Sequence, residues 1–438
     1  MNNRVWDLFD RFRGFVDVNT FFDLVAYALL LKYVELKKPY YYQDNYSIRY
    51  LSRLYGDIIL ESDLCRYIGE IEKDNNIPAG LLEQSFRNII RKFESEREKQ
   101  ALLAFFRELS EIDFISENEL SASFDYLLDK VPPSMGRMGG CESFTNIYLA
   151  RLESAVLDVN EGQEIYDPFC GSGISIVASG GKFNPLSVRD KNSDIVAIAT
   201  INMILHGCKI REVTCGDSLF AEIRTYDRVV SEPPLNVYYP DNIYDRFKDN
   251  LTYTISRDSL ELELIINSLN DYGKAVVLVP QGFFFRSGRS LEYRKHLVEA
   301  NIIDSIINLP AGVLYGTAIS ASLLLINKNK RNKDILMLDS SSLWDKRNLR
   351  ELILSDESIN KIVEIISNRE EKIGISKIVK YEEIKENNFN LAPTFYVAPY
   401  TADDIEVKDV KGLITKQQEL EEDLSKVSQK LYKMRHIE

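Results

Sequence analysis

Short apolar runs alternate with helical stretches over the second part of the chain, and this alternation restricts the fold more than any other feature. The runs predict strands. Between the early ones, residues 174–179 and 194–206 predict helices, the second with Ser193 as N-cap and Gly207 just past its end. Strand–helix–strand repetition is typical of a parallel, doubly wound α/β sheet that binds ligands at the carboxyl ends of its strands. The predicted strands span residues 164–167, 186–190, 227–230, 274–280, 302–309 and 322–327, and a further strand is expected to end at Cys215.

The first 130 residues have a different pattern, that of amphipathic helices. Phe21, Leu24, Val25 and Ala28 follow the i, i+3, i+4, i+7 spacing of one helix face. Residues 131–140 then contain two prolines and three glycines, which predict a linker or hinge loop. We therefore predict a helical N-terminal domain over residues 1–130, the α/β domain over residues 131–400 and a helical C-terminal tail over residues 401–438.

The most informative segment is residues 166–173, Tyr-Asp-Pro-Phe-Cys-Gly-Ser-Gly, which ends a predicted strand and opens a predicted helix. Gly171 and Gly173 allow a tight turn and let a ligand lie against bare backbone. For this segment taken alone, an ordinary glycine turn without a ligand is the alternative interpretation. The residues at the neighbouring strand ends favour the ligand.

Acidic residues stand at the ends of three successive predicted strands. Asp167 ends the first, and Asp190 follows the glycines at the spacing where doubly wound folds place an acid on a pair of ribose hydroxyls. Asp217, after the third, is suited to accept a hydrogen bond from the exocyclic amine of a base. The fourth strand ends in a Pro-Pro turn, Pro233-Pro234. Together these features predict an adenosyl ligand with an electrophilic group nearby.

The charge balance limits how the chain binds nucleic acid. With 67 acidic and 54 basic residues, the formal net charge is −13, which argues against a chain that wraps nucleic acid unaided. It leaves room for a local basic groove or a basic partner. Lys328, Lys330, Arg331 and Lys333 form such a local patch, either as a phosphate contact or simply as exposed loop charge.

Other classes of protein are excluded by local composition. The longest strongly apolar stretch, residues 24–31, is far shorter than the roughly 20 residues that a membrane-spanning helix requires. The amino terminus has no apolar signal region, so we predict no targeting segment and a cytoplasmic protein. The five cysteines form no CxxC pair and the three histidines stand apart, which predicts free, buried thiols and no metal site.

The ordered series of segments resembles the N6-adenine DNA methyltransferase family, specifically the modification (M) subunit of type I restriction-modification systems. Residues 167–173 match the family's Asp-Pro-x-Cys-Gly-Ser/Thr-Gly loop, and residues 202–207 match its Asn-Met-x-Leu-His-Gly helix end. The resemblance covers nearly the whole chain. Its other segments are residues 5–7, 11–14, 29–32, 124–128, 142–146, 273–282, 309–313 and 387–391, with Arg294, Leu297 and Tyr396.

The resemblance implies an S-adenosylmethionine-dependent methyltransferase sheet with known functional positions. The residues it assigns to the cofactor pocket are Phe144, Thr145, Asp167, Gly171, Gly173 and Asp190, with Asp217 on the adenine of the cofactor. The family's catalytic Asn-Pro-Pro-Phe/Tyr corresponds to Glu232, Pro233, Pro234 and Leu235. The implied partners are DNA, a specificity subunit and a restriction translocase-nuclease subunit within a hetero-oligomer. A stripe of leucines in the tail, Leu420, Leu424 and Leu431, is the candidate docking surface.

The reacting motif departs from the family pattern at two positions. Glu232 stands in place of asparagine, and Leu235 in place of the aromatic residue that stacks on the flipped-out base. The family's Thr-Pro is Thr145-Asn146 here. The first hypothesis is therefore an adenine-N6 methyltransferase subunit, and the second a degenerate scaffold that binds cofactor or DNA within a defence complex. A third is methylation of a glutamine amide or of RNA.

Overall fold

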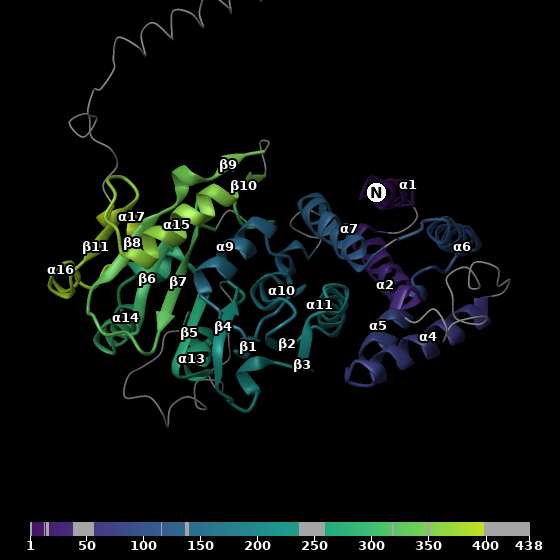
Figure 1. Ribbon diagram of the computed structural model, residues 1–438, viewed down its shortest axis with the longest axis horizontal. Coiled ribbons are helices and arrows are strands. Elements are labelled where there is room, and N and C mark those ends of the chain that lie inside the picture. Colours follow the sequence, from purple (N-terminus) through teal and green to yellow (C-terminus); the bar gives the residue numbers. More distant parts are fainter. Residues whose placement is uncertain are drawn as a thin grey trace, which may run out of the picture. The chain divides into compact units, whose positions relative to one another are not determined.

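The computed structural model describes residues 2–12, 14, 17–37, 57–114, 116–135, 140–235, 259–317, 319–347 and 351–397. These residues all belong to one compact unit, in which a group of helices packs against one end of a large sheet (Figure 1). The predicted C-terminal tail and its leucine stripe lie outside the described residues. The domain boundary near residue 130 stays a prediction.

A sheet of nine strands forms the centre of the α/β part, in the order β11-β8-β6-β7-β5-β4-β1-β2-β3. The predicted strands are present, although β5 begins earlier than predicted, and β8 and β11 extend the sheet beyond the prediction. The strands are β1 (Ile165–Asp167), β2 (Pro185–Asp190), β3 (Lys209–Cys215), β4 (Tyr226–Ser231), β5 (Leu269–Pro280), β6 (Ile303–Asn308), β7 (Ala321–Asn327), β8 (Ile335–Asp339) and β11 (Ser376–Val379).

The sheet is mixed, which corrects the prediction of an all-parallel one. Strands β3, β2, β1, β4 and β5 are parallel neighbours, whereas β7 runs antiparallel to both β5 and β6, and β11 antiparallel to β8. The connection from β6 to β7 contains no helix among its described residues. Because a parallel return normally needs a helical crossover, the chain turns back beside β6 and enters the sheet antiparallel.

Both faces of the sheet are covered, so its central strands are buried on both sides. Along β5, Val276 and Leu278 lie in one core and Val277 and Val279 in the other, as the two-residue period of a strand requires. The first core is closed by α9 (Ile147–Leu157), α10 (Ile174–Gly180) and α11 (Ser193–Leu205), and the second by α13 (Leu260–Asn267) and α14 (Arg289–Glu299). This is the doubly wound arrangement expected from the sequence.

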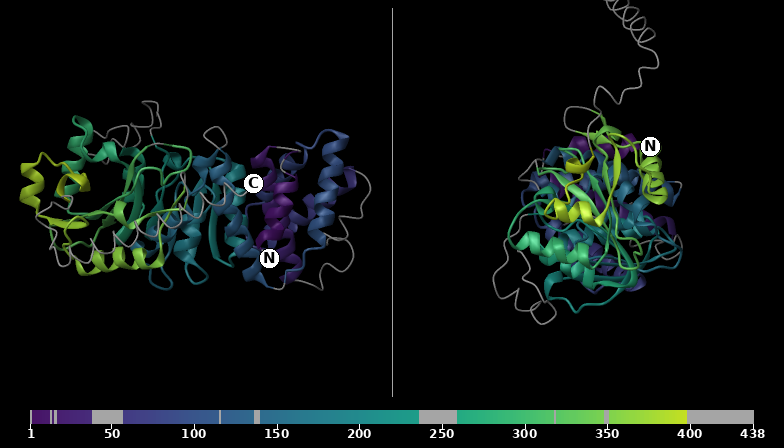
Figure 2. Two further views of the ribbon diagram at one scale, coloured as in Figure 1. Left: turned by 90° about the horizontal axis from the view of Figure 1, so that it is seen from above. Right: turned by 90° about the vertical axis from the view of Figure 1, so that its left-hand side faces the viewer.

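The N-terminal helices pack around α2 (Val18–Lys37) and lie at the β3 end of the sheet (Figures 1 and 2). Burial of α2 extends well beyond the predicted stripe, because every residue from Leu24 to Leu31 is buried. A helix that is apolar on all sides lies inside a bundle rather than on its surface. The other helices here are α1 (Asn2–Phe12), α4 (Asp57–Asp74), α5 (Leu81–Ile90), α6 (Glu96–Ser110), α7 (Glu117–Lys130) and α8 (Pro132–Met135).

Helix α11 joins the helical part to the sheet. It is buried from Ile195 to Leu205, since it contacts β2 and β3 as well as α2, α5 and α7. Just past its end, Nε2 of His206 lies 3.2 Å from the carboxylate of Asp125 on α7. Burial alone would lower the pKa of His206, but the hydrogen bond and the charge of Asp125 outweigh it and raise that pKa.

Two local predictions are wrong. The N-cap of α11 is Asn192, whose side-chain oxygen accepts a hydrogen bond from the backbone N–H of Asp194, whereas the predicted cap Ser193 is the first helical residue. The predicted linker begins with the short helix α8, in which prolines occupy the first turn, where no N–H donor is needed. Val131 before it is fully buried. The start of this segment is therefore packed rather than a free linker.

Smaller elements complete the described structure. They are the 3₁₀ turns η1 (Cys141–Ser143), η2 (Ser218–Phe220), η4 (Gln281–Phe284) and η5 (Ser341–Leu343), the hairpin strands β9 (Asp345–Lys346) and β10 (Leu352–Ile353), and the helices α15 (Asp356–Asn368), α16 (Tyr381–Glu386) and α17 (Pro393–Tyr396).

Candidate active site

The glycine loop between β1 and α10 lies directly against the backbone of η1. Gly171 has φ +49°, a left-handed conformation, and a Cβ atom at this position would stand 2.6 Å from the carbonyl oxygen of Ser143. The same carbonyl accepts a hydrogen bond of 2.9 Å from the backbone N–H of Ser172. Only glycine combines this backbone conformation with so close an approach. The structure thus explains Gly171 by the contact between the loop and the segment that leads to Thr145.

Gly173, in contrast, allows α10 to pack closely against α11. Its φ is +75°, and a Cβ atom there would stand 3.1 Å from Ala199 of α11. Asn202 of α11 donates a hydrogen bond of 3.1 Å from its side-chain amide to the carbonyl of Ser172. The predicted family-like segments 167–173 and 202–207 therefore lie side by side and are joined by a hydrogen bond.

The carboxyl of Asp167 is buried beneath this loop. Only 2% of the residue is exposed, and Oδ1 accepts hydrogen bonds from the Ser231 hydroxyl, at 2.9 Å, and from the Phe169 backbone N–H, at 3.0 Å. Burial, assisted by the charges of Glu232 and Asp190, raises the pKa of Asp167 to about 8 against the opposing effect of these hydrogen bonds. Asp167 thus ties the end of β1 to the end of β4, a contact that the sequence analysis did not predict.

Asp190 organises the next strand end. Its Oδ2 accepts a hydrogen bond of 3.2 Å from the N–H of Gly171, and its Oδ1 one of 3.0 Å from the N–H of Asn192. Its backbone carbonyl accepts from the N–H of Gly216, after β3. The residue is partly exposed. Because each carboxylate oxygen accepts more than one hydrogen bond, Asp190 keeps acceptor capacity for a ligand.

The third strand end is held by a serine that the sequence analysis missed. Asp217 accepts a hydrogen bond of 2.9 Å from the N–H of Leu219 and so caps η2. The hydroxyl of Ser218 donates to the carbonyl of Pro168 at 2.5 Å, across to the glycine loop. Ser218 and Ser231 carry no spacing signal, since their role depends on which strands are neighbours in the sheet.

Glu232 faces the cofactor segment rather than standing alone after β4. Its Oε1 accepts a hydrogen bond from the Thr145 hydroxyl, at 2.5 Å, and from the Ser175 hydroxyl of α10, at 3.2 Å. Burial outweighs both hydrogen bonds and raises the pKa of Glu232 to about 7. Two residues from separate predictions, Thr145 for the cofactor and Glu232 for catalysis, are therefore in direct contact.

The remaining site residues stand apart from this network. The ring of Phe144 meets Phe22 of α2 edge-on, with centroids 5.2 Å apart, and is nearly buried. Pro233 and Leu235 are partly exposed and Pro234 is exposed. Leu235 is the last described residue before a gap, so the chain that follows the reacting motif lies outside the described residues.

The predicted basic patch lies at the opposite edge of the sheet, in the turn after β7. Lys328 donates from Nζ to the carbonyl of Leu269, at 2.7 Å, and Lys330 to that of Ile303, at 2.6 Å. Burial lowers the pKa of both, that of Lys330 to about 8. These two lysines hold strand ends together and do not share an edge with Glu232.

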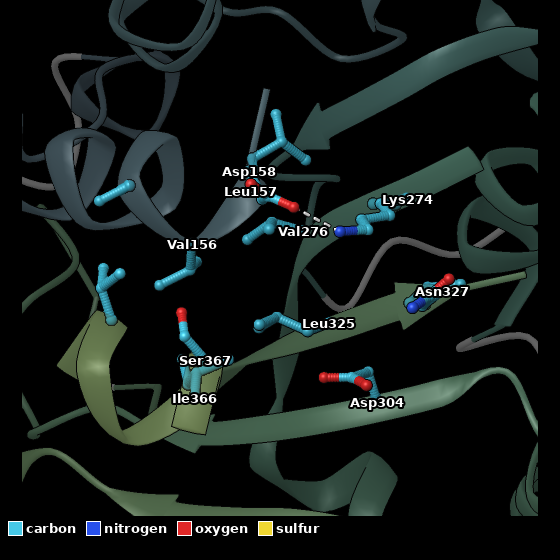
Figure 3. A pocket seen from close by; sticks show the side chains of 14 residues that line it. Val156, Leu157, Asp158, Lys274, Val276, Asp304, Leu325, Asn327, Ile366 and Ser367 are labelled. Atoms are coloured by element: carbon cyan, nitrogen blue, oxygen red, sulfur yellow. Dashed lines mark hydrogen bonds and ion pairs between the residues drawn. The ribbon is translucent and has the colours of Figure 1, made fainter. Parts of the chain in front are cut away.

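A cavity of about 330 Å³ lies at that same opposite edge, between the end of α9, the start of β5, the end of β7 and α15 (Figure 3). Its walls are apolar at Val156, Val276 and Leu325. At its rim, Lys274 and Asp158 form an ion pair of 2.5 Å, which Figure 3 marks with a dashed line. The cavity is separated from the glycine loop by the length of the strands.

Within the described residues, no group of three His, Cys, Asp or Glu side chains is arranged to hold a metal ion. Nor does any described helix combine the length and apolar character needed to cross a bilayer. The five cysteines, all within the described residues, form no disulfide, and the predicted burial holds only for Cys65, Cys141 and Cys170. Cys208 is half-buried and Cys215 is exposed, because β3 is an edge strand.

A doubly wound sheet with a glycine loop after β1 and acids after β1, β2 and β3 defines the class of S-adenosylmethionine-dependent methyltransferase folds. Residues 115–404 match the family model of the N-6 DNA Methylase family. The match covers most of the chain, and the chain belongs to this family. The resemblance recognised in the sequence is thereby confirmed.

Two curated relatives agree with this assignment. The chain is 27% identical over 411 residues to the type I restriction enzyme MjaVIII methylase subunit of Methanocaldococcus jannaschii, covering 86% of this chain and 68% of the relative. The MjaVII methylase subunit of the same organism is 29% identical over 342 residues, 70% of this chain and 58% of the relative.

A crystal structure of the type I restriction-modification system methyltransferase subunit from Streptococcus thermophilus has a similar fold. Its TM-score is 0.71 at 20% identity, and the match covers 91% of this chain and 99% of that one. At this level of identity the likeness concerns the fold alone.

Proposed function

We propose that the chain is the adenine-N6 DNA methyltransferase (modification) subunit of a type I-like restriction-modification system, with S-adenosylmethionine as methyl donor. Membership of the N-6 DNA Methylase family supports the reaction, and the similarity to type I methylase subunits supports the system. The single observation that carries the proposal is the meeting of the glycine loop, Asp190 and Glu232 at one edge of the sheet.

The chain's own residues are suited to S-adenosylmethionine. Asp190 is partly exposed at the end of β2, where its remaining lone pairs would accept from the ribose hydroxyls. The carboxylate of Asp217 would accept from the adenine amine, because among the described residues it accepts one hydrogen bond, on Oδ1 from the N–H of Leu219, and keeps lone pairs on both oxygens. The N–H of Gly171 donates to Oδ2 of Asp190 and so keeps the glycine loop beside the proposed ribose acceptor. When bound, the cofactor supplies an electrophilic methyl group.

The role of Glu232 follows from the chemistry of adenine. The N6 amine is a poor nucleophile, because its lone pair is delocalised into the ring, and positive charge develops on it during methyl transfer. An oxygen acceptor aimed at that amine stabilises the charge. Glu232 offers such an oxygen, Oε2, since Oε1 already accepts from Thr145 and Ser175. We infer that these two hydroxyls orient the carboxyl and that Glu232 remains the residue in contact with the substrate.

A catalytically degenerate scaffold is the second candidate, and a specific observation favours it. One oxygen of Glu232 is occupied inside the protein, and Leu235 provides no aromatic face for a flipped base. Such a scaffold would bind cofactor or DNA within a defence complex without transferring a methyl group. DNA, a specificity subunit and a restriction subunit are proposed partners under either function.

Incorporation of labelled methyl groups into DNA by the reconstituted complex separates the two candidates. If Glu232 is functional, the wild-type complex should transfer methyl groups at a measurable rate. This rate should fall in Glu232→Gln and in the double variant Glu232→Asn with Leu235→Phe. A degenerate site predicts a silent wild type and a gain in the double variant. An oriented hydrogen bond at a developing charge is worth about 3 kcal/mol, roughly a hundredfold in rate, and base stacking adds about 1–3 kcal/mol. Glu161→Gln, at an exposed glutamate, is the matched control.

A further inference from the structure

A second glutamate lies buried beneath the reacting motif. Glu153 is on α9, is 0% exposed, and neither of its carboxyl oxygens has a hydrogen-bond partner within the described part of the chain. A charged carboxylate in such a place would lose its hydration without compensation. A buried glutamate of this kind is stable only when it carries a proton or gains a partner.

The groups around Glu153 favour the proton. Glu232 and Asp167 place negative charge near it, and the hydroxyl of Ser175, which lies nearby but makes no hydrogen bond of good geometry with Glu153, opposes this effect. Among the described residues, no basic side chain offsets these charges. Burial, reinforced by the repulsion from Glu232, therefore raises the pKa of Glu153 well above its ordinary value. Because repulsion from Glu232 contributes to this shift, an ionised Glu232 disfavours the ionisation of Glu153.

Ser175 is a polar neighbour of both glutamates. It lies on α10, directly after the glycine loop, and donates to Oε1 of Glu232. Helices α9 and α10 are packed against each other, with Glu153 buried on α9. The carboxyl of Glu232 thus accepts hydrogen bonds from the Thr145 and Ser175 hydroxyls on Oε1, and the carboxyl of Glu153 is near enough to repel it.

We propose that Glu153 is a positioning residue of the reacting motif, which holds a proton so that Glu232 is the only member of the pair free to ionise. This inference rests on the proposed function. With Glu153 neutral, Glu232 is the one of the two glutamates that places negative charge next to the amine on which positive charge develops. With both glutamates ionised, their mutual repulsion would drive Glu232 away from Thr145 and Ser175. Glu153 acts only through Glu232 and does not itself touch the substrate.

The proposal predicts how stability changes with pH. A carboxyl whose pKa is raised in the folded state binds more protons folded than unfolded, so folding weakens as the pH rises from the ordinary glutamate pKa to the raised one. Glu153 contributes about a tenfold change in the unfolding equilibrium constant per pH unit over this window. Asp167 and Glu232 contribute slopes of their own, since their pKa values are also raised. Glu153→Gln, a neutral isostere, removes only the part of the pH dependence of stability that comes from Glu153.

The experiment measures the free energy of unfolding of the full chain by chemical denaturation between about pH 5 and pH 8, for wild type, Glu153→Gln and the exposed control Glu161→Gln. Only in Glu153→Gln do we expect the unfolding free energy to change less steeply with pH than in wild type. The difference amounts to up to about a tenfold change in the unfolding equilibrium constant per pH unit. Identical slopes in all three proteins would overturn the proposal. Glu153→Met, neutral and of similar length, replaces Glu153→Gln if that variant does not fold.

Methyl transfer supplies the second readout. Where the reconstituted complex is active, wild type should lose activity as the pH rises through the raised pKa of Glu153, and Glu153→Gln should keep its activity. A loss with rising pH that is unchanged in Glu153→Gln contradicts the positioning role. A complex that is inactive in every variant refutes the proposed function, whereas the unfolding slopes still decide whether Glu153 carries the proton.

Discussion

Replacing Gly171 by alanine is the sharpest test of the cofactor loop. Two costs act at this position. Alanine is strained at φ +49°, because its Cβ approaches the backbone carbonyl, at about 1–2 kcal/mol. The same Cβ would stand 2.6 Å from the carbonyl oxygen of Ser143, an atom of the backbone that cannot rotate away. Relieving such an overlap by shifting the backbone typically costs a further 1–3 kcal/mol or so.

Gly162 is the matched control, since it separates the two costs. It has φ +86°, again left-handed, but an added Cβ meets no atom of the described residues within 4 Å. Gly162→Ala should therefore lose only the strain energy. We expect Gly171→Ala to be less stable than Gly162→Ala by about 1–3 kcal/mol in chemical denaturation.

Cofactor binding gives the functional half of the test. Moving the loop away from Ser143 also moves the Gly171 N–H from Asp190, the acceptor proposed for the ribose. A displaced Asp190 would lose its proposed hydrogen bond to the ribose, and a hydrogen bond to a charged group is worth about 1.5–3 kcal/mol, roughly tenfold or more in affinity. Calorimetry with S-adenosylmethionine should show this loss in Gly171→Ala and none in Gly162→Ala. Equal stability and equal affinity of the two variants would refute the argument.

Three further outcomes are expected. Asp190→Ala should bind S-adenosylmethionine about tenfold more weakly or worse, and calorimetric affinity equal to wild type would remove the pocket assignment. Asp125→Asn should lower the pKa of His206 in an NMR titration. The interaction between Asp125 and His206 stabilises the fold below the ordinary histidine pKa of about 6.5, and this stabilisation is lost as the pH rises through the raised pKa. The variant should therefore lose more stability at pH 6 than at pH 8, by less than about 1 kcal/mol because Asp125 is half-exposed. The isolated chain, with a net charge of −13, should bind DNA weakly and without sequence preference in a mobility-shift assay, and tight selective binding would contradict this expectation.

The sequence predicted much of the fold because the relevant signals are local. The strands β1, β2, β4, β6 and β7 appear close to their expected bounds. Apolar runs, helix caps and glycines depend on a few neighbouring residues, so they are visible in the printed order. The antiparallel insertion of β7 was missed because it depends on contacts between distant segments, whereas the misplaced cap of α11 is a local error, since Asn192 and Ser193 are adjacent residues that both suit an N-cap.

For the candidate site, the sequence by itself determined which residue types stand at the strand ends. Gly171, Asp167 and Asp190 are recognisable because strand period and turn geometry place them there whatever the rest of the chain does. Their assigned roles in binding remain predictions. What a single position contributes chemically was also visible, since Glu232 is an acid wherever it lies.

Only the tertiary structure decided which of these groups share one environment. Thr145 and Ser175 donate to Glu232, and Glu153 is buried nearby without a hydrogen-bond partner among the described residues. In the sequence, α9 is an ordinary helix that contains one glutamate. Whether a carboxyl is charged depends on the water and the charges around it. Those are set by the packing of α9 and α10 against the sheet, which no spacing along the chain encodes.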